Sequence, residues 1–239
     1  QNVLGIHTSL SGADLRSGDY VSKPVMGGRT IIRYLGSESF LTLPQTLSGE
    51  ALYGIESKAF AGNPQLLRVI IPAGVEQIAV NAFFGSPYLT VIVLKSSQPA
   101  GYQNGWNNGV AESYFAEGAI LNDASGNQFI MSGGGAVLIK AANLETMTLS
   151  FTYTIRRIAA NAFAEAPALR VVRIPESVSN AGEYAFRGCR NTLVLLDAAQ
   201  VPVGWAQGWS EYVLGYYTNA SASAERTTAD GFRVILYNN

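Results

Sequence analysis

The chain has 239 residues, of which 48% are hydrophobic and 14% charged, and its formal net charge is -1. This composition is too apolar for a disordered chain, and the balanced charge lacks the basic excess that binds nucleic acid. The apolar runs fall well short of the roughly 20 residues that a transmembrane helix needs, so we expect no membrane span.

Residues 1–18 form an N-terminal segment without clear periodicity, which begins with Gln1 rather than Met. That start is typical of a mature chain whose targeting segment has been removed. The segment holds His7, the single histidine of the sequence, on which any Ser-His-Asp or Cys-His arrangement would depend. With Cys189 as the single cysteine, neither an intrachain disulfide nor a metal site with several His or Cys ligands is possible. We therefore expect no catalytic residue of these kinds, no cofactor and no metal.

Two segments predict β-hairpins, because strand-forming residues flank a glycine-rich tip in each. They span residues 20–35 and 128–141, with Gly27–Gly28 and Gly133–Gly135 at the tips. Glycine supplies the positive φ that a tight hairpin turn needs. A pair of short repeats follows each hairpin, so the hairpin is placed to cover one end of the pair.

The dipeptide Ala-Phe marks each copy of this repeat, which is 23 residues long. The four phenylalanines are Phe60, Phe83, Phe163 and Phe186. In three copies an isoleucine stands five residues before the phenylalanine and a leucine six residues after it. The segment with Val69 and Ile71 is rich in β-branched residues and predicts a strand, which Pro72 ends. One strand and one short helical or 3-10 turn per repeat is typical of a solenoid coil.

A longer period of 103 residues encloses the repeats and indicates a tandem duplication. The matched pairs include Phe60 with Phe163, Pro72 with Pro175, Trp106 with Trp209 and Tyr114 with Tyr217. Two coils are fewer than the three or so that a repeat stack needs, so the hairpin and a Gly-Trp segment must cap each pair. We therefore expect a β-rich, leucine-rich-repeat-like solenoid of the α/β class in two capped modules, residues 19–126 and 127–239.

The pattern I-x-x-x-A-F-x-x-x-x-x-L-x-x-V-x-I-P resembles the BspA-like leucine-rich repeat of bacterial surface proteins. The Ala-Phe copies, the Ile-Pro endings at Pro72 and Pro175 and the Phe-to-Leu spacing carry the resemblance over roughly residues 50–97 and 153–199. Cys189 stands where that family often has cysteine. The resemblance implies an exported bacterial protein, secreted or at the cell surface, that acts in adhesion or recognition and has no catalytic residues. We accordingly expect a non-enzymatic protein that binds a host or bacterial surface protein or matrix, or alternatively a glycan.

Alternation along the predicted strands leaves an outward face that is unusually apolar for a surface. It carries Arg68, Ile70, Val91, Val93, Val171 and Arg173, followed by Val194 and Leu196. Exposed apolar patches usually mark contact sites, so the first six residues are candidates for partner binding. Alternatively, this face is buried between the two modules or under a hairpin, and the sequence does not separate the two interpretations.

Aromatic residues gather after each repeat pair, and exposed rings can stack on sugars. Trp205, Tyr212 and Tyr216 have no strict counterparts at the 103-residue offset and are the candidates for glycan stacking. The rings that keep register across the duplication favour a structural role in closing the open ends of the coils. They are Trp106, Trp209, Tyr114 and Tyr217.

Two carboxylates, Glu112 and Glu117, lie near the predicted strand around Tyr114. Glycosidases use paired carboxylates, so a hydrolase that acts through them is a third hypothesis. Solvated surface carboxylates are the alternative. Their register partners in the second module, Gly215 and Ala220, are not acidic.

Overall fold

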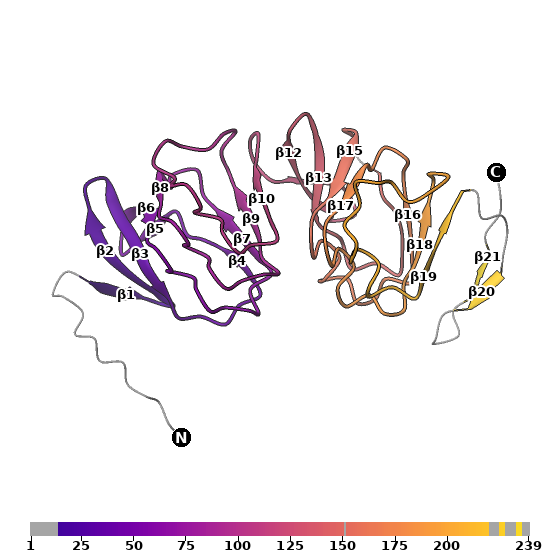
Figure 1. Ribbon diagram of the computed structural model, residues 1–239, viewed down its shortest axis with the longest axis horizontal. Helices are drawn as coiled ribbons and strands as arrows, with labels where there is room; N and C mark the ends of the chain where they lie inside the picture. The colour runs from indigo at the N-terminus through magenta and orange to yellow at the C-terminus, as the bar shows by residue number, and fades with distance from the viewer. Residues whose placement is uncertain (1–13, 151, 220–224, 228–232, 236–239) are drawn as a thin grey trace, which may run out of the picture.

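The computed structural model describes residues 14–150, 152–219, 225–227 and 233–235. His7 and most of the expected N-terminal segment lie outside the described residues. The chain forms two β-solenoids that lie side by side along the long axis of the molecule (Figure 1). The first solenoid spans residues 15–115, the second spans residues 121–218, and a separate strand pair follows between residues 225 and 235.

Two sheets enclose one core in the first solenoid. The first hairpin sheet comprises β1 (Leu15–Ser17), β2 (Tyr20–Val25), β3 (Gly28–Tyr34), β5 (Thr46–Leu47), β6 (Glu50–Ile55) and β8 (Gln77–Ile78). The first outer sheet comprises β4 (Phe40–Thr42), β7 (Arg68–Ile71), β9 (Thr90–Val93) and β10 (Glu112–Phe115). The core contains side chains from both sheets, such as Ile31 and Val69.

The second solenoid repeats this plan. Its hairpin sheet comprises β11 (Leu121–Asn122), β12 (Gln128–Ser132), β13 (Gly135–Lys140), β15 (Ile155–Ile158) and β17 (Asn180–Ala181). Its outer sheet comprises β14 (Thr146–Thr148), β16 (Val171–Ile174), β18 (Leu193–Leu196) and β19 (Gly215–Thr218). The last two strands, β20 (Glu225–Thr227) and β21 (Arg233–Ile235), pair antiparallel. β1 pairs with β2, and β11 pairs with β12. Each hairpin sheet therefore begins before residues 19 and 127, the expected first residues of the two modules.

The chain alternates between the two sheets and adds a strand to each with every coil. β3, β6 and β8 are parallel neighbours in the first hairpin sheet, and β4, β7, β9 and β10 are parallel neighbours in the first outer sheet. This alternation is that of a leucine-rich-repeat-like solenoid, and its plan is duplicated. The fold class predicted from the two periods is therefore confirmed.

The segment before each repeated phenylalanine is a turn where we expected a helical or 3-10 turn, and the described residues contain no helix. Backbone hydrogen bonds close these turns, such as the one from the Ala162 N–H to the Ala159 carbonyl oxygen at 3.2 Å. The residue two positions before the phenylalanine has a positive φ in every coil: 60° at Lys58, 58° at Asn81, 58° at Asn161 and 55° at Tyr184. A type II turn requires this conformation at its third residue, where glycine or asparagine is preferred.

A column of aromatic rings runs through the core of the first solenoid. Phe60 stacks between Tyr34 and Phe83, with ring centroids 5.2 Å away on both sides. Trp106 follows with its centroid 6.3 Å from that of Phe83. The column joins successive coils, and Trp106 closes its end.

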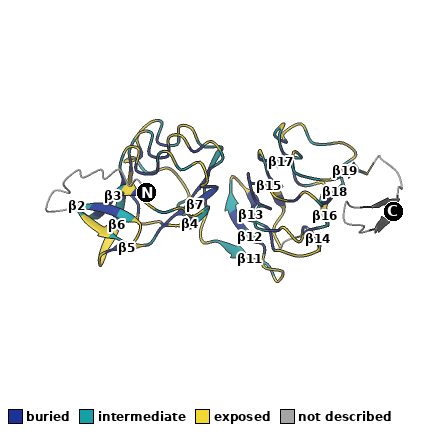
Figure 2. Cartoon of the chain, turned by 90° about the horizontal axis from the view of Figure 1, so that it is seen from below, coloured by how far each residue is buried: buried dark blue, intermediate teal, exposed yellow. Residues whose placement is uncertain are grey.

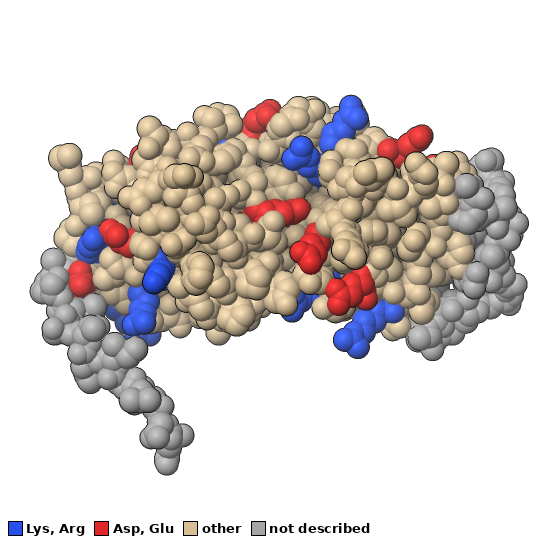
Figure 3. Space-filling model, viewed as in Figure 1, with Lys and Arg blue, Asp and Glu red and all other residues tan. Residues whose placement is uncertain are grey.

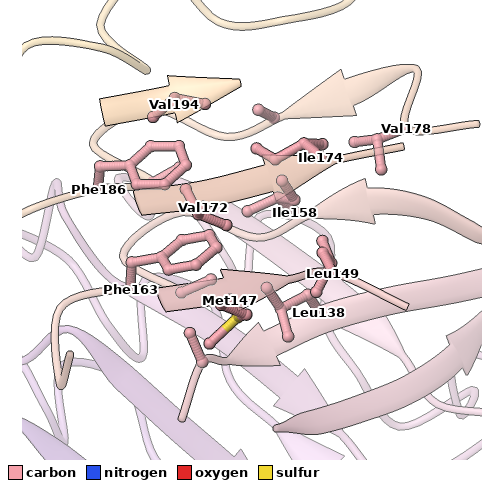
Figure 4. Close-up of a cluster of buried hydrophobic side chains, with 14 of the residues drawn as sticks. Leu138, Met147, Leu149, Ile158, Phe163, Val172, Ile174, Val178, Phe186 and Val194 are labelled. Atoms are coloured by element: carbon pink, nitrogen blue, oxygen red, sulfur yellow. The ribbon is translucent and has the colours of Figure 1, made fainter. Parts of the chain in front are cut away.

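The second solenoid has the same column with one ring fewer. Phe163 and Phe186 stack with centroids 4.3 Å apart, and Trp209 follows at 5.9 Å. Figure 4 shows the two phenylalanines one above the other, with Val172 and Val194 beside them. Trp209 closes this end of the coils, as its register across the duplication predicted.

The strand register corrects which side chains face the core. The 23-residue period predicted that Ile92 points inward and that Val91 and Val93 point outward. Strands of successive coils are instead 22 residues apart, because the link between the repeated leucine and its strand is one residue shorter in the later coil. Val91 and Val93 therefore lie in the core and Ile92 faces away from it. The same shift places Val194 and Leu196 in the second core.

Candidate interaction surfaces

The second solenoid covers the outward face of the first outer sheet. The buried cluster at this junction contains Ile70, Ile92 and Tyr114 from the first solenoid, Ala116 directly after it, and Ile130, Val137, Ile139 and Ala159 from the second. β7 and β13, which carry part of it, are buried along most of their length (Figure 2). For the first module, the interpretation in which this face is buried between the modules is therefore correct.

Arg68 supplies the polar contacts on one side of the junction. Its Nη1 donates to the carbonyl oxygen of Ile139 at 2.9 Å, and its Nη2 donates to Oε2 of Glu165 at 2.8 Å. Lys140 donates to the other carboxylate oxygen of Glu165 at 3.0 Å. Burial by itself raises the pKa of Glu165, but the hydrogen bonds from Arg68 and Lys140 outweigh burial and lower it. Glu165 is thus held in its charged form between the solenoids.

Glu112, one of the two candidate catalytic carboxylates, belongs to the same junction. Its Oε2 accepts hydrogen bonds from the Tyr114 hydroxyl at 3.0 Å and from the backbone N–H of Ala160 at 2.7 Å. Burial raises the pKa of Glu112, although these two bonds and the charge of Arg157 act in the opposite direction. The carboxyl group therefore joins the two solenoids.

Glu117, the other candidate, accepts the backbone N–H of Gly133 at 3.1 Å, at the tip of the β12–β13 hairpin. A pocket of about 190 Å³ lies beside Glu112, and among the described residues Glu112 is the one carboxylate that lines it. Glycoside hydrolysis needs two carboxyl groups that face one space. The structure does not bring Glu112 and Glu117 together in this pocket, and both make structural contacts.

The six predicted partner-binding residues fall into three environments. The four in the first solenoid are buried, Arg68 and Ile70 in the junction and Val91 and Val93 in the core. The expectation that these four form an exposed face is wrong, because the second solenoid covers one pair and the shifted register turns the other pair inward. On the second outer sheet, Val171 is half-buried and Arg173 is exposed. The Nε of Arg173 donates to Oδ1 of Asp197 at 2.6 Å.

The three predicted glycan-stacking residues also differ in exposure. Trp205 is buried, its indole N–H donates to the Val178 carbonyl at 3.2 Å, and its ring packs edge-on against Trp209. A buried ring offers no face to a sugar. Tyr216 is 47% exposed and Tyr212 is half-buried, so both stay candidates for an exposed role.

Three tyrosine rings form a row across the junction. Tyr88 of the first solenoid contacts Tyr184 of the second, with ring centroids 5.2 Å apart and planes at 72°. Tyr184 in turn contacts Tyr212 at 6.0 Å and 67°. The guanidinium of Arg187 lies over the Tyr88 ring, 4.8 Å from its centroid. All four side chains are partly exposed, and we call Tyr88, Tyr184, Arg187 and Tyr212 the tyrosine row.

Tyr184 occupies a turn position whose backbone conformation is unfavourable for tyrosine. Its φ is 55°, at the position that Asn81 and Asn161 fill in two of the other coils. The left-handed region costs an ordinary L-residue roughly 1–2 kcal/mol, and asparagine tolerates it better. Lys58 fills this position in the remaining coil, so the turn also accepts residues other than asparagine. Strained residues cluster at functional sites, which makes the Tyr184 ring a candidate for such a role. Sequence reasoning missed Tyr88, Tyr184 and Arg187, although the repeat alignment already places Tyr184 where asparagine recurs.

Cys189 is an unreactive group of the core. Its Sγ lies 3.4 Å from the Phe163 carbonyl oxygen, and burial raises the pKa of the thiol to about 11 against the weaker opposing effect of Thr192. Structural cysteines buried in this way are inert. Within the described ranges, no group of three or more His, Cys, Asp or Glu residues is placed to hold a metal ion. No helix long and apolar enough to span a membrane occurs in the part of the chain that the structure describes.

The fold and the repeats define a β-solenoid of the leucine-rich-repeat class. The BspA type leucine rich repeat region matches residues 33–106 and 135–197 in six copies. These ranges cover more than half of the chain and fall within the two solenoids, and the chain belongs to this family. A comparison with curated proteins gives no match.

Solved structures of bacterial leucine-rich repeat proteins are similar to this chain. A leucine rich repeat protein of T. pallidum is 22% identical, with 77% of this chain and 71% of that chain covered and a TM-score of 0.34. A leucine rich cell surface protein from Faecalibacterium prausnitzii A2-165 is 16% identical, with 95% and 62% covered and a TM-score of 0.36. A leucine-rich repeat protein from Bacteroides capillosus ATCC 29799 is 17% identical, with 78% and 99% covered and a TM-score of 0.29. The chain thus spans less than two thirds of the Faecalibacterium protein.

Proposed function

We propose that this chain is a non-enzymatic, secreted or cell-surface bacterial protein that binds a protein partner through the tyrosine row. Membership of the BspA-type family supports an interaction role. The Faecalibacterium protein is a leucine rich cell surface protein, in keeping with the proposed location. The observation that carries the proposal is the row itself, in which partly exposed rings from both solenoids meet and Tyr184 is held at a strained turn.

The composition of the row is that of an interface centre. Tyrosine and arginine are enriched in such centres because they supply a large contact area together with polar groups. Figure 3 shows Lys, Arg, Asp and Glu scattered over a largely uncharged surface. At the row itself, Glu183 and Glu211 act on Tyr184 and Arg187 lies over the Tyr88 ring, so polar groups accompany the ring contacts. Because the row crosses the junction, a partner that covers it contacts both solenoids at once.

The geometry of the rings favours a protein over a carbohydrate. A sugar stacks on an open ring face, whereas rings at 72° and 67° to their neighbours present alternating edges and faces. Protein side chains can pack into the uneven surface that such rings form. Carbohydrate binding through Tyr212 and Tyr216 is the second candidate function, because Tyr216 leaves nearly half of its surface exposed.

The variant Tyr184→Asn separates binding from folding. Asparagine suits the positive φ, and the relief of strain should offset the loss of the ring contacts with Tyr88 and Tyr212, so we expect an unfolding temperature close to that of the parent chain. Surface plasmon resonance against a panel of purified host and bacterial surface proteins should show at least a ten-fold loss of affinity for each protein that the parent chain binds. Tyr153→Asn, an exposed tyrosine outside the row, is the matched control and should bind like the parent.

Unchanged affinity in Tyr184→Asn would contradict the proposal. Weaker binding together with a lower unfolding temperature would instead indicate damage to the fold. A glycan array tests the second candidate. If the parent chain binds a glycan but no protein, and Tyr216→Ala abolishes that binding, the carbohydrate function replaces the protein function.

A further inference from the structure

We propose that the strand pair β20–β21 docks on the outward face of the second outer sheet, much as the second hairpin sheet covers the first outer sheet. The apolar part of this face consists of Val171, Leu193, Leu195 and Tyr217, which we call the apolar floor. An exposed ion pair between Arg173 and Asp197 borders it. The inference rests on the junction between the solenoids and is independent of the tyrosine row.

The pair β20–β21 repeats the two strands that begin the second solenoid. Both pairs are antiparallel, and the last register partners before the loop are Asn122 with Gln128 in one and Thr227 with Arg233 in the other. Five residues separate the partners in each case, and the fourth of them is glycine, Gly126 or Gly231. The register therefore gives Ile235 the position that Ile130 has in β12.

The connection to each pair is also alike. Five residues separate β10 from β11, and six separate β19 from β20. The first connection brings β12 to the first outer sheet, where Ile130 is buried in the junction cluster. The second connection leaves β19, the equivalent strand of the second outer sheet, and has nearly the same length. It therefore keeps β21 within reach of the apolar floor.

The floor differs from its counterpart in a way that fits this occupant. On the first outer sheet, Thr90 Oγ1 donates to the Ala160 carbonyl at 3.2 Å, and Glu112 accepts the Ala160 N–H at 2.7 Å. At the 103-residue offset these two positions hold Leu193 and Gly215, and the Leu193 side chain lies against Gly215. The floor thus lacks the polar groups that bind a backbone turn on the first outer sheet, and its apolar residues suit a strand that holds the register position of Ile130.

A second copy of the chain fits the floor less well. Its first hairpin sheet carries Lys23 and Glu56, an ion pair of 2.8 Å with both side chains about 40% exposed. These residues occupy the register positions at which the second hairpin sheet has Ile130 and Ala159. Covering the apolar floor with that sheet would bury this ion pair against apolar residues that offer it no further hydrogen bonds, which is costly.

Cross-linking of the full chain tests the docking. Leu195→Cys and Ile235→Cys are combined in a Cys189→Ala background, where alanine is expected to fold because Ala166 fills the same slot in the preceding coil. A short bis-maleimide should give an intrachain bridge, seen as a monomer of faster electrophoretic migration. Met26→Cys with Ile235→Cys is the control and should give no bridge, because Met26 is an exposed residue of the first hairpin.

A bridge between two chains would assign the floor to a second copy and overturn the proposal. If no bridge forms, a second measurement decides, because two badly oriented cysteines would also fail to react. The double variant Leu195→Cys with Ile235→Asp should react with a maleimide at least ten-fold faster than the single variant Leu195→Cys. An unchanged rate would show that β21 does not shield the floor.

Discussion

Replacement of Phe83 by alanine should destabilise the chain by about 3–5 kcal/mol. Phe83 has no exposed surface, and its ring lies between Phe60 at 5.2 Å and Trp106 at 6.3 Å. An aromatic side chain buries on the order of 150–250 Å² at about 25 cal/mol per Å². The transfer loss is therefore about 3 kcal/mol once the surface that alanine still buries is subtracted. The cavity adds to this cost, because the two neighbouring rings belong to other coils and cannot close the gap.

Thermal unfolding followed by near-UV circular dichroism measures this effect, since Trp106 borders the cavity. For a chain of this size, a loss of 3–5 kcal/mol lowers Tm by roughly 6–20 °C. Phe84, the adjacent residue, is 54% exposed and provides the matched control. Phe84→Ala should change Tm by less than about 2 °C. Equal losses in the two variants, or no loss in Phe83→Ala, would refute the aromatic column as a source of stability.

Three further predictions concern the junction and the buried thiol. Burial raises the pKa of Glu112 in the folded chain above the ordinary value of 4.5. Protonated Glu112 therefore contributes stability below pH 4.5, and this contribution is lost as pH rises through the raised pKa. Glu112→Gln should remove that pH dependence and be at least as stable as the parent in urea at pH 7; a less stable variant would contradict this. Hydrogen bonds from Arg68 and Lys140 lower the pKa of Glu165 although burial acts to raise it. The stability contributed by charged Glu165 is therefore present above pH 4.5 and is lost as pH falls through the lowered pKa. Glu165→Gln should cost about 1–3 kcal/mol at pH 7, less than a fully buried pair, and an equal cost under strongly acidic conditions would argue against the ion pairs. Cys189, with a pKa of about 11, should resist maleimide at pH 7 until urea unfolds the chain, and labelling of the native protein would show that the thiol is accessible.

Spacing along the chain was enough to predict the coils, because each repeated phenylalanine occupies the same place in its turn. The outer sheets were harder, since the side chains of a strand alternate with a period of two. Loss of one residue between the repeated leucine and the strand exchanged the two faces and moved Val91 and Val93 into the core. The phenylalanine and leucine positions still matched at 23 residues, so nothing in them marked the shift.

The interaction surfaces depend on contacts between coils that the repeats do not encode. An outward Ile70 or Ile92 is compatible with a partner or with another module, and only the packing of the second solenoid separates these cases. The tyrosine row joins Tyr88 and Tyr184 across 96 positions of sequence, so no local pattern connects them. One signal was nevertheless present, because Tyr184 breaks the preference of its turn position for a residue that accepts a positive φ.

Differences between the duplicated copies show which faces of the solenoids are covered. In the outer sheets and the residues just after them, the first solenoid has Ile70 and Leu94 where the second has the ion pair of Arg173 and Asp197. In the hairpin sheets the first solenoid has the ion pair of Lys23 and Glu56 where the second has Ile130 and Ala159. Each apolar pair lies on a face that the other solenoid covers, and each ion pair lies on a face that it leaves open. An uncovered apolar pair would add to an exposed patch, and a covered ion pair would cost several kcal/mol of desolvation, so exchanging the two solenoids would be penalised at both faces. The order of the solenoids is therefore specified by the positions at which the copies differ.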